Sequence, residues 1–300
     1  MKNKFKILFA SVISLAYISS FACTSMGFAG NIVKGGGTLI FKNRDAEIIG
    51  KERLEIFKFK QGNSFLALTY NTDNTAKGYP YIAGGTNSKG LTVLVNDPAS
   101  HMPAAKNVDQ IETTTVENLL KNYSTVAQVE KNKAKIFSQN NPALYTISDH
   151  QQVANFEEGY KGEYGSKVTN NGYVWNTNYY HLNNVNNQNQ DSSTDIVDRT
   201  NILKKWIANM PKKVQLGDLT RLSASHYNGE FNSINRQFTV AKYFAVSPPN
   251  SKDTYLYIRL TIPTQKFNSY HLTINDKFFD DNPAGPLDNN KYGLLGSINN

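Results

Sequence analysis

The chain has 300 residues, of which 39% are hydrophobic, 12% aromatic and 19% charged. This composition suits one medium-sized globular domain and excludes a disordered polypeptide. The formal net charge is +8, but the basic residues are scattered and no run of five or six occurs, which argues against an electrostatic nucleic-acid binder. After residue 22 no stretch approaches the roughly 18 to 20 apolar residues that cross a bilayer, so we expect no stable membrane insertion.

The first 22 residues predict a secretory signal peptide. Residues 1–6 are basic, residues 7–22 are uncharged and mostly apolar, and small residues stand at Ser20 and Ala22. This pattern predicts cleavage by signal peptidase after Ala22. The mature chain would be a single domain of residues 23–300, and loss of the leader lysines would lower the formal net charge from +8 to +5. We expect an exported protein, periplasmic or secreted, and the sequence leaves the oligomeric state open, a homo-oligomer included.

Cys23, the first residue of this predicted mature chain, is the only cysteine. Exported proteins normally pair their cysteines in disulfides, so a single thiol needs an explanation of its own. One explanation is a terminal residue without a role, and a second is a lipidated cysteine. However, a lipoprotein signal usually carries an aliphatic residue three places before the cysteine, and this chain has Ser20 there, followed by the bulky Phe21.

A third explanation is that Cys23 is an N-terminal nucleophile. Its thiolate would attack an amide carbonyl while the α-amino group of the same residue, whose ordinary pKa is about 7.7 to 8.0, takes the thiol proton. This chemistry needs an exposed amino terminus. Signal-peptidase cleavage would supply that terminus, so that export and activation would be one event.

The first expected strands form a hairpin. Residues 23–28 are apolar and hydroxyl-rich, the three glycines at 35–37 predict a turn, and residues 38–41 predict the second strand. The hairpin folds Cys23 back along that strand, toward the two cations and the carboxylate of residues 42–45. Further strands are predicted at residues 53–59, 65–70 and 91–95.

Helical spacing of apolar residues follows, with Val116, Leu119 and Leu120 in one helix, Val126 to Ile136 in a second, and Ser124 as the N-cap between them. The later predicted elements are strands at 144–147 and 172–175, a polar loop at 183–190, helices at 196–210 and 216–226, strands at 238–246 and 254–262, and a polar tail that loops over the surface after Ile274. Strands, then helices, then strands again predict an α+β domain whose antiparallel sheets are covered by helices.

Seven short segments carry a resemblance to a known family. In chain order they are Cys23-Thr24, Phe41 to Asp45, Gly85 to Asn96, Tyr145 to Glu157 with an aspartate at the turn of two strands, Val174 to Asn178, Asp198-Arg199, and the strand pair 238–244 and 255–260. Together they resemble the choloylglycine hydrolase and penicillin V acylase family of N-terminal-nucleophile hydrolases, to which acyltransferases of the isopenicillin N type are related. The resemblance implies a four-layer αββα sandwich of two antiparallel sheets flanked by helices.

The resemblance also implies five catalytic residues. Cys23 would be the nucleophile, and Asp45 would accept hydrogen bonds from its amino group. Asn96 and Asn178 would donate to the oxyanion of the tetrahedral intermediate, by side-chain amide or backbone N–H. Arg199 would balance the charge of the site.

Lys42 and Arg44 are candidates for a cation that stabilises the Cys23 thiolate. The family commonly has arginine at the place of Lys42 and an apolar residue at the place of Arg44. Because neighbouring residues of a strand point to opposite faces, we expect at most one of the two side chains to reach the site.

The function that the resemblance implies is an exported thiol amidohydrolase that cleaves the linear amide of an N-acylated small molecule and requires no cofactor. Conjugated bile acids, penicillin V and N-acyl homoserine lactones all fit as substrates. An acyltransferase would differ in resolving the thioester with an amine in place of water. A non-catalytic lipoprotein would carry a lipid on Cys23. The five histidines are dispersed without metal-ligand spacing.

Overall fold

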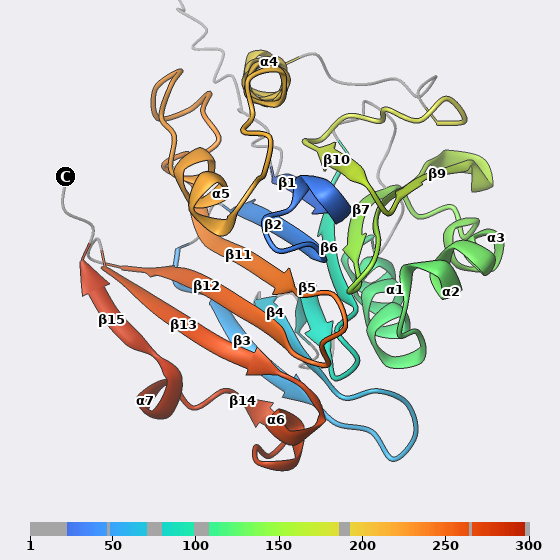
Figure 1. Cartoon of the computed structure of the whole chain (residues 1–300), viewed down its shortest axis with the longest axis vertical. Coiled ribbons are helices and arrows are strands. Elements are labelled where there is room, and N and C mark those ends of the chain that lie inside the picture. Colours follow the sequence, from blue (N-terminus) through green and yellow to red (C-terminus); the bar gives the residue numbers. More distant parts are fainter. Residues whose placement is uncertain are drawn as a thin grey trace, which may run out of the picture.

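The computed structural model describes residues 23–46, 49–70, 80–98, 108–185, 193–263 and 266–297 (Figure 1). The predicted signal peptide, residues 1–22, lies outside these ranges, as does most of the predicted polar loop at 183–190. Within the described ranges, no helix combines the length and the apolar character needed to cross a membrane.

Two antiparallel sheets form the centre of the molecule. The first has seven strands in the order β10 (Gly172–Asn176), β1 (Thr24–Ala29), β2 (Thr38–Asp45), β11 (Thr239–Ser247), β12 (Thr254–Ile262), β13 (Lys266–Ile274) and β15 (Leu294–Ser297). The second has eight strands in the order β14 (Gly285–Pro286), β3 (Glu52–Phe57), β4 (Phe65–Tyr70), β5 (Tyr81–Asn87), β6 (Thr92–Asn96), β7 (Ala143–Ser148), β8 (Val153–Glu158) and β9 (Tyr164–Thr169).

Helices cover the outer faces of both sheets (Figure 1). On the eight-stranded sheet lie α1 (Val108–Asn122), α2 (Val126–Lys131) and α3 (Lys133–Phe137), and on the seven-stranded sheet lie α4 (Thr194–Ala208) and α5 (Leu216–Ser223). The expected αββα sandwich is therefore confirmed.

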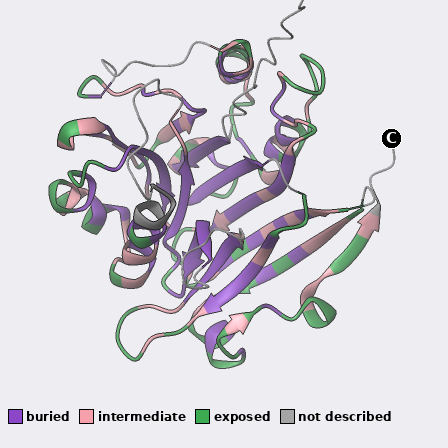
Figure 2. Ribbon diagram, turned by 180° about the vertical axis from the view of Figure 1, so that it is seen from behind, coloured by how far each residue is buried: buried purple, intermediate pink, exposed green. Residues whose placement is uncertain are grey.

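Three large apolar cores hold these layers together. The central strands of both sheets are buried along most of their length (Figure 2). The core between the sheets contains Ile40, Leu68 and Tyr243. A second core joins the α1 residue Leu119 to the eight-stranded sheet, and a third joins the α4 residue Leu203 to the seven-stranded sheet. Because both faces of the central strands are covered, they consist largely of apolar residues.

The opening hairpin forms as expected. β1 and β2 pair antiparallel with Thr24 opposite Asn43, and the connection contains a short 3-10 turn, Gly30–Ile32, and the three glycines. Gly37 has a φ of +73°, and a side chain there would collide with the carbonyl oxygen of Ser247. Glycine is the residue that adopts this left-handed conformation at no steric cost, so the turn brings Cys23 to the far end of β2.

The expectation of a tail looping over the surface is wrong. β13 ends at Ile274, and α6 (Asp276–Asp280), β14, α7 (Asn289–Tyr292) and β15 follow it. β14 and β15 each add an edge strand to one of the two sheets. Phe278, Phe279 and Leu287 are buried. These elements have two to five residues each, too few for a hydrophobic period to show in the sequence.

Two helix boundaries also differ from the expectation. Thr125, and not Ser124, caps α2: its hydroxyl accepts a hydrogen bond from the Gln128 N–H at 3.2 Å, and the Gln128 side chain returns to the Thr125 N–H. The predicted second helix is interrupted at Asn132, which separates α2 from α3. The shorter predicted helix ends at Ser223.

Candidate active site

Cys23 immediately precedes β1, the second strand of the seven-stranded sheet. It is a free cysteine with 1% of its surface exposed. β1 pairs with β2 on one side and with β10 on the other, with Thr24 opposite Asn43 and Ser25 opposite Asn176. Continuing both registers to residue 23 places Cys23 between Arg44 and Asn178. The hairpin therefore brings the cysteine to the predicted partners from two different strands.

Arg199 connects two other predicted site residues, Cys23 and Asn178. It lies on α4, is fully buried, and donates from Nη1 to the carbonyl oxygen of Cys23 at 2.9 Å and to the hydroxyl of Thr24 at 3.2 Å. Its Nη2 donates to the Asn178 side-chain oxygen at 2.9 Å. Cys23, Asn178 and Arg199 come from widely separated parts of the sequence, so only the fold brings them together.

The two predicted oxyanion donors lie on either side of the gap between the sheets. The side-chain amide of Asn96, at the end of β6, donates to the Ser25 hydroxyl and to the Thr177 carbonyl oxygen, both at 3.1 Å. Both of its N–H groups are thus used in joining the sheets. Asn178 donates to the carbonyl oxygen of Asp97 at 2.6 Å. Because Arg199 donates to the Asn178 side-chain oxygen, the other end of the Asn178 amide carries the N–H groups.

Asp45 is buried at the end of β2, on the face that the helices cover. It accepts hydrogen bonds from the Thr239 hydroxyl at 2.7 Å and from Arg236 Nη1 at 3.3 Å. Burial raises the pKa of Asp45 above its ordinary value, and the positive charges of Arg236 and Arg199 oppose that rise. The predicted hydrogen bond from the Cys23 amino group to this carboxylate stays a prediction.

The expectation that at most one of Lys42 and Arg44 points toward the site treats them as adjacent residues of the strand, and it is wrong. The two residues are two apart in β2, so both side chains point to the same face, between the sheets. Lys42 donates to the carbonyl oxygens of Ala83, at 3.1 Å, and Val95. Lys42 therefore links the two sheets.

Arg44 is the cation that faces Cys23. Its guanidinium lies over the ring of Tyr70, 4.3 Å from the centroid, and forms an ion pair with Glu52 at 3.5 Å. Burial alone would lower the pKa of Arg44, but the negative charges available at Cys23, Tyr81 and Glu52 raise it above the ordinary value. The Arg44 Nη2 has no hydrogen-bond partner among the described residues.

Sequence reasoning missed Arg236 and Asp195. Arg236 Nη1 contacts the Oδ2 atoms of both Asp45 and Asp195 at 3.3 Å, and Asp195 Oδ2 also contacts Arg199 at 3.3 Å. Arg236 lies three residues before β11 in a polar loop, and no motif in the sequence marks it. Asp195 precedes Arg199 by one helical turn, so an ion pair at (i, i+4) was the one available signal.

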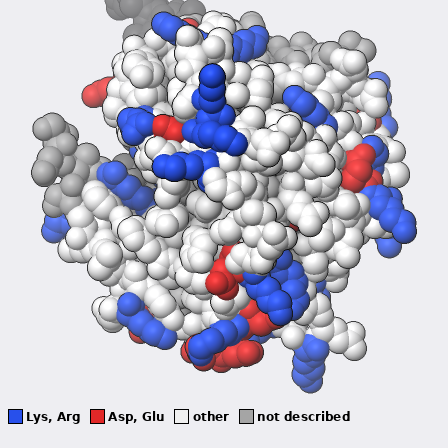
Figure 3. Space-filling model, viewed as in Figure 1, with Lys and Arg blue, Asp and Glu red and all other residues white. Residues whose placement is uncertain are grey.

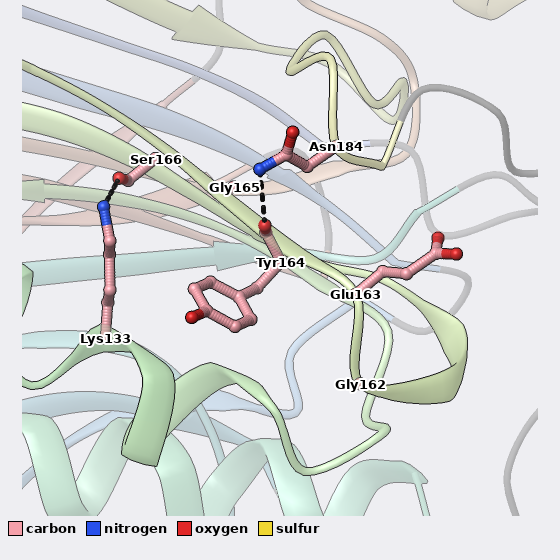
Figure 4. A pocket seen from close by; sticks show the side chains of 7 residues that line it. All are labelled: Lys133, Gly162, Glu163, Tyr164, Gly165, Ser166 and Asn184. Carbon is pink, nitrogen blue, oxygen red and sulfur yellow. Dashed lines mark hydrogen bonds between the residues drawn. The ribbon is translucent and has the colours of Figure 1, made fainter.

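The hollow drawn in Figure 4 is separate from these residues. It has a volume of about 470 Å³ and is lined by Lys133, Asn184 and residues 162–166, and it shares no residue with the site described above. Charges on the face in Figure 3 form small groups of mixed sign. Among the described residues, no three His, Cys, Asp or Glu side chains are placed to hold a metal ion.

Solved structures share this fold at low sequence identity. A mutant of the conjugated bile acid hydrolase from Clostridium perfringens superposes with a TM-score of 0.55 at 14% identity, covering 92% of this chain and 100% of that one. Penicillin V acylase from Agrobacterium tumefaciens gives 0.51 at 10% identity, covering 85% and 89%. The Caenorhabditis elegans ortholog of N-acylethanolamine-hydrolyzing acid amidase gives 0.50 at 12% identity, covering 77% and 95%.

No protein-family model matches the chain, and no curated protein matches it in sequence. At these identities the superpositions establish the fold, and they confirm the fold that the sequence resemblance implied.

Proposed function

We propose that this chain is an exported amidohydrolase that uses Cys23 as an N-terminal nucleophile on N-acylated small molecules. The observation that carries the proposal is the position of Arg199, which bonds both to the backbone of the only cysteine and to Asn178. The names of the three structurally similar proteins, a conjugated bile acid hydrolase, a penicillin V acylase and an acid amidase, agree with amide cleavage.

The reaction follows from the groups around Cys23. The α-amino group takes the thiol proton, and the thiolate attacks the amide carbon, forming a C–S bond. Asn178 and nearby backbone N–H groups would stabilise the oxyanion. The ammonium group then gives its proton to the departing amine as the C–N bond breaks. Water, deprotonated by the same amino group, hydrolyses the thioester and restores the thiol.

The surroundings of Cys23 support roles for its two charged neighbours. Arg44 would be the cation for the developing thiolate, because the β1–β2 register places it opposite Cys23 and Lys42 is engaged with carbonyl groups of the other sheet. Asp45 would orient the α-amino group. Ser20 and Phe21, which stand where a lipoprotein signal usually carries an aliphatic and a small residue, disfavour the lipoprotein alternative.

The mass of the exported protein tests the first half of this proposal. Cleavage after Ala22 predicts a mature chain that begins with an unmodified Cys23. Recovery of a lipid adduct on the cysteine, or of a chain that keeps its leader, would contradict the proposal.

Replacing Cys23 by serine tests the second half. We expect Cys23→Ser to abolish hydrolysis of penicillin V, a glycine-conjugated bile acid and an N-acyl homoserine lactone, because the serine hydroxyl is a much weaker nucleophile than a thiolate. The melting temperature should stay close to that of the native protein. Undiminished turnover by the variant would rule out Cys23 as the nucleophile.

A further inference from the structure

Four charged groups form a continuous network on the helix-covered face of the seven-stranded sheet. Arg236 Nη1 bridges Asp45 and Asp195, and Asp195 bridges Arg236 and Arg199, with all N–O distances at 3.3 Å. At its end, Arg199 contacts the Cys23 carbonyl oxygen at 2.9 Å. Three of the four side chains are at least nine-tenths buried, and Asp195 is 19% exposed.

The local backbone fixes Arg236 and Thr239 together. The Arg236 N–H donates to the Thr239 hydroxyl at 2.9 Å, the Thr239 N–H donates to the Arg236 carbonyl oxygen at 3.0 Å, and the Thr239 hydroxyl donates to Asp45. The register between β11 and β2 shifts between Thr239 and Ala241. Such a bulge re-aims a side chain, and here it lets one short turn present both a hydroxyl and a guanidinium to Asp45.

Arg236 is the charged donor to the buried carboxylate of Asp45. A buried carboxylate without a partner takes up a proton, and the only uncharged donor to Asp45 among the described contacts is Thr239. The charged groups around Asp45 are Arg236 from the loop before β11, Arg199 from α4 and Lys242 from β11. Arg199 is engaged with Cys23 and Asn178, and Lys242 donates to the Ser223 carbonyl oxygen at 3.0 Å.

We propose that Arg236 is a positioning residue, which holds the Asp45 carboxylate and, through Asp195, the guanidinium of Arg199 in the arrangement that the Cys23 site uses. The inference rests on the proposed function, but its geometric part stands apart from the identity of the substrate. Arg236 would touch neither the substrate nor the reacting atoms. Its charge would act on Cys23 only through the two aspartates.

The first test reads the charge of Asp45 directly. The carboxyl carbons of aspartate are followed by 13C NMR against pH in the mature protein, with the Asp45 signal assigned by its loss in Asp45→Asn. Removing a neighbouring opposite charge shifts a carboxyl pKa by about one to three units. We expect the Asp45 midpoint to rise by about one unit or more in Arg236→Met and to return toward the native value in Arg236→Lys.

A matched control comes from the surface of α5. Arg221 forms an exposed ion pair with Asp218, and its side chain is 73% exposed, so Arg221→Met should leave the Asp45 midpoint unchanged. Thr239→Val removes the other donor to the same carboxylate and should shift the midpoint in the same direction as Arg236→Met. If Arg236→Met does not fold, Arg236→Lys and Thr239→Val carry the test.

The second test measures kcat and KM for whichever of the three probe amides the native protein cleaves fastest. Arg236→Met should lower kcat at least tenfold with little change in KM, whereas Arg236→Lys should recover most of it. An unchanged Asp45 midpoint, or unchanged kcat, in a folded Arg236→Met protein would overturn the inference. An active Cys23→Ser variant would instead overturn the proposed function, so the two failures are distinguishable.

Discussion

Two cations on one strand have different roles at the scale of single residues. Lys42 and Arg44 share a face of β2, yet Lys42 donates to carbonyl groups of β5 and β6, while Arg44 lies over Tyr70 and opposite Cys23. The difference follows from what stands across the gap between the sheets. Residue type alone would assign both cations the same role.

We therefore expect Arg44→Met to change the reactivity of the Cys23 thiol and Lys42→Met to change the stability of the fold. Loss of Arg44 removes the charge that faces the thiolate, so alkylation of the single thiol of the mature protein by iodoacetamide should slow by about tenfold. Loss of Lys42 leaves buried carbonyl groups without a donor, which should lower the free energy of unfolding by about 1 to 3 kcal/mol and change alkylation little. Equal effects of the two variants on alkylation would refute the assignment of Arg44.

Asp45→Asn should impair turnover more than substrate binding, because in the proposed mechanism the carboxylate orients the amino group of Cys23 and does not contact substrate. Burial raises the pKa of Asp45, so its ionised form, and the activity that depends on it, is lost as pH falls through that raised value. On the acid side, log kcat/KM of the native enzyme should steepen from a slope of about one to about two, because amine and carboxylate both take up protons.

The control for this prediction is Asp281→Asn, which removes the carboxylate of an exposed ion pair with Lys277. That variant should keep the native profile. A slope of two retained in Asp45→Asn would show that another group is responsible for the second proton.

At the scale of elements, the start of α2 shows how local chemistry sets a boundary. Thr125 and Gln128 form a reciprocal capping box, and Asp149, in the turn between β7 and β8, accepts a hydrogen bond from the Val126 N–H at 2.7 Å. The helix is thus joined to the sheet at its first turn. Sequence reasoning placed the cap one residue early, because Ser124 and Thr125 are both good capping residues.

Thr125→Ala should lower the free energy of unfolding by about 1 kcal/mol, the usual contribution of an N-cap hydroxyl, and Thr125→Ser should restore most of it. Ser124→Ala is the matched control, and we expect a smaller effect from it. Urea denaturation of the three variants measures the differences. A larger loss for Ser124→Ala than for Thr125→Ala would show that the cap lies at the earlier residue.

At the scale of the whole molecule, buried carboxylates on β8 couple stability to pH. Glu157 accepts hydrogen bonds from the His181 and Leu182 N–H groups, and Glu158 from those of Gln139 and Asn141. Burial raises the pKa of each carboxyl from 4.5 to about 7. These two residues tie the loop after Asn178 and the loop before β7 to β8, the strand next to the edge strand β9 of the eight-stranded sheet.

The sign of this coupling is opposite to that of a surface ion pair. Between pH 4.5, the unfolded value, and about 7, the folded value, the folded state holds a proton that the unfolded state has lost, so stability falls as pH rises. Glu158→Gln should remove the part of this slope that Glu158 contributes. That part is on the order of 3 kcal/mol in the free energy of unfolding across the window. Thermal unfolding from pH 5 to about 8 measures it, and an unchanged slope would contradict the prediction.

The amino-acid sequence by itself determined the elements whose signals are local. The β1–β2 hairpin, the strands β4 and β12, and the existence of α1 and α4 could be predicted, because glycine turns and apolar periodicity operate within a few residues of chain. The unpaired thiol at position 23 and the order of the family-like segments pointed to the αββα fold. The short C-terminal edge strands could not be predicted, since edge strands of two to four residues gain their stability from the sheets they join.

Only the tertiary structure decided how charges meet around Cys23. Arg236 follows Asp45 by 191 residues, and neither residue carries a mark of the other in the sequence. Which cation faces the thiol depended on what the second sheet presents to β2. Burial excludes water from these charged pairs, so the energy of each pair depends on the groups that lie next to it in the fold. The packing of the layers decides which groups those are, and the local sequence does not encode that packing.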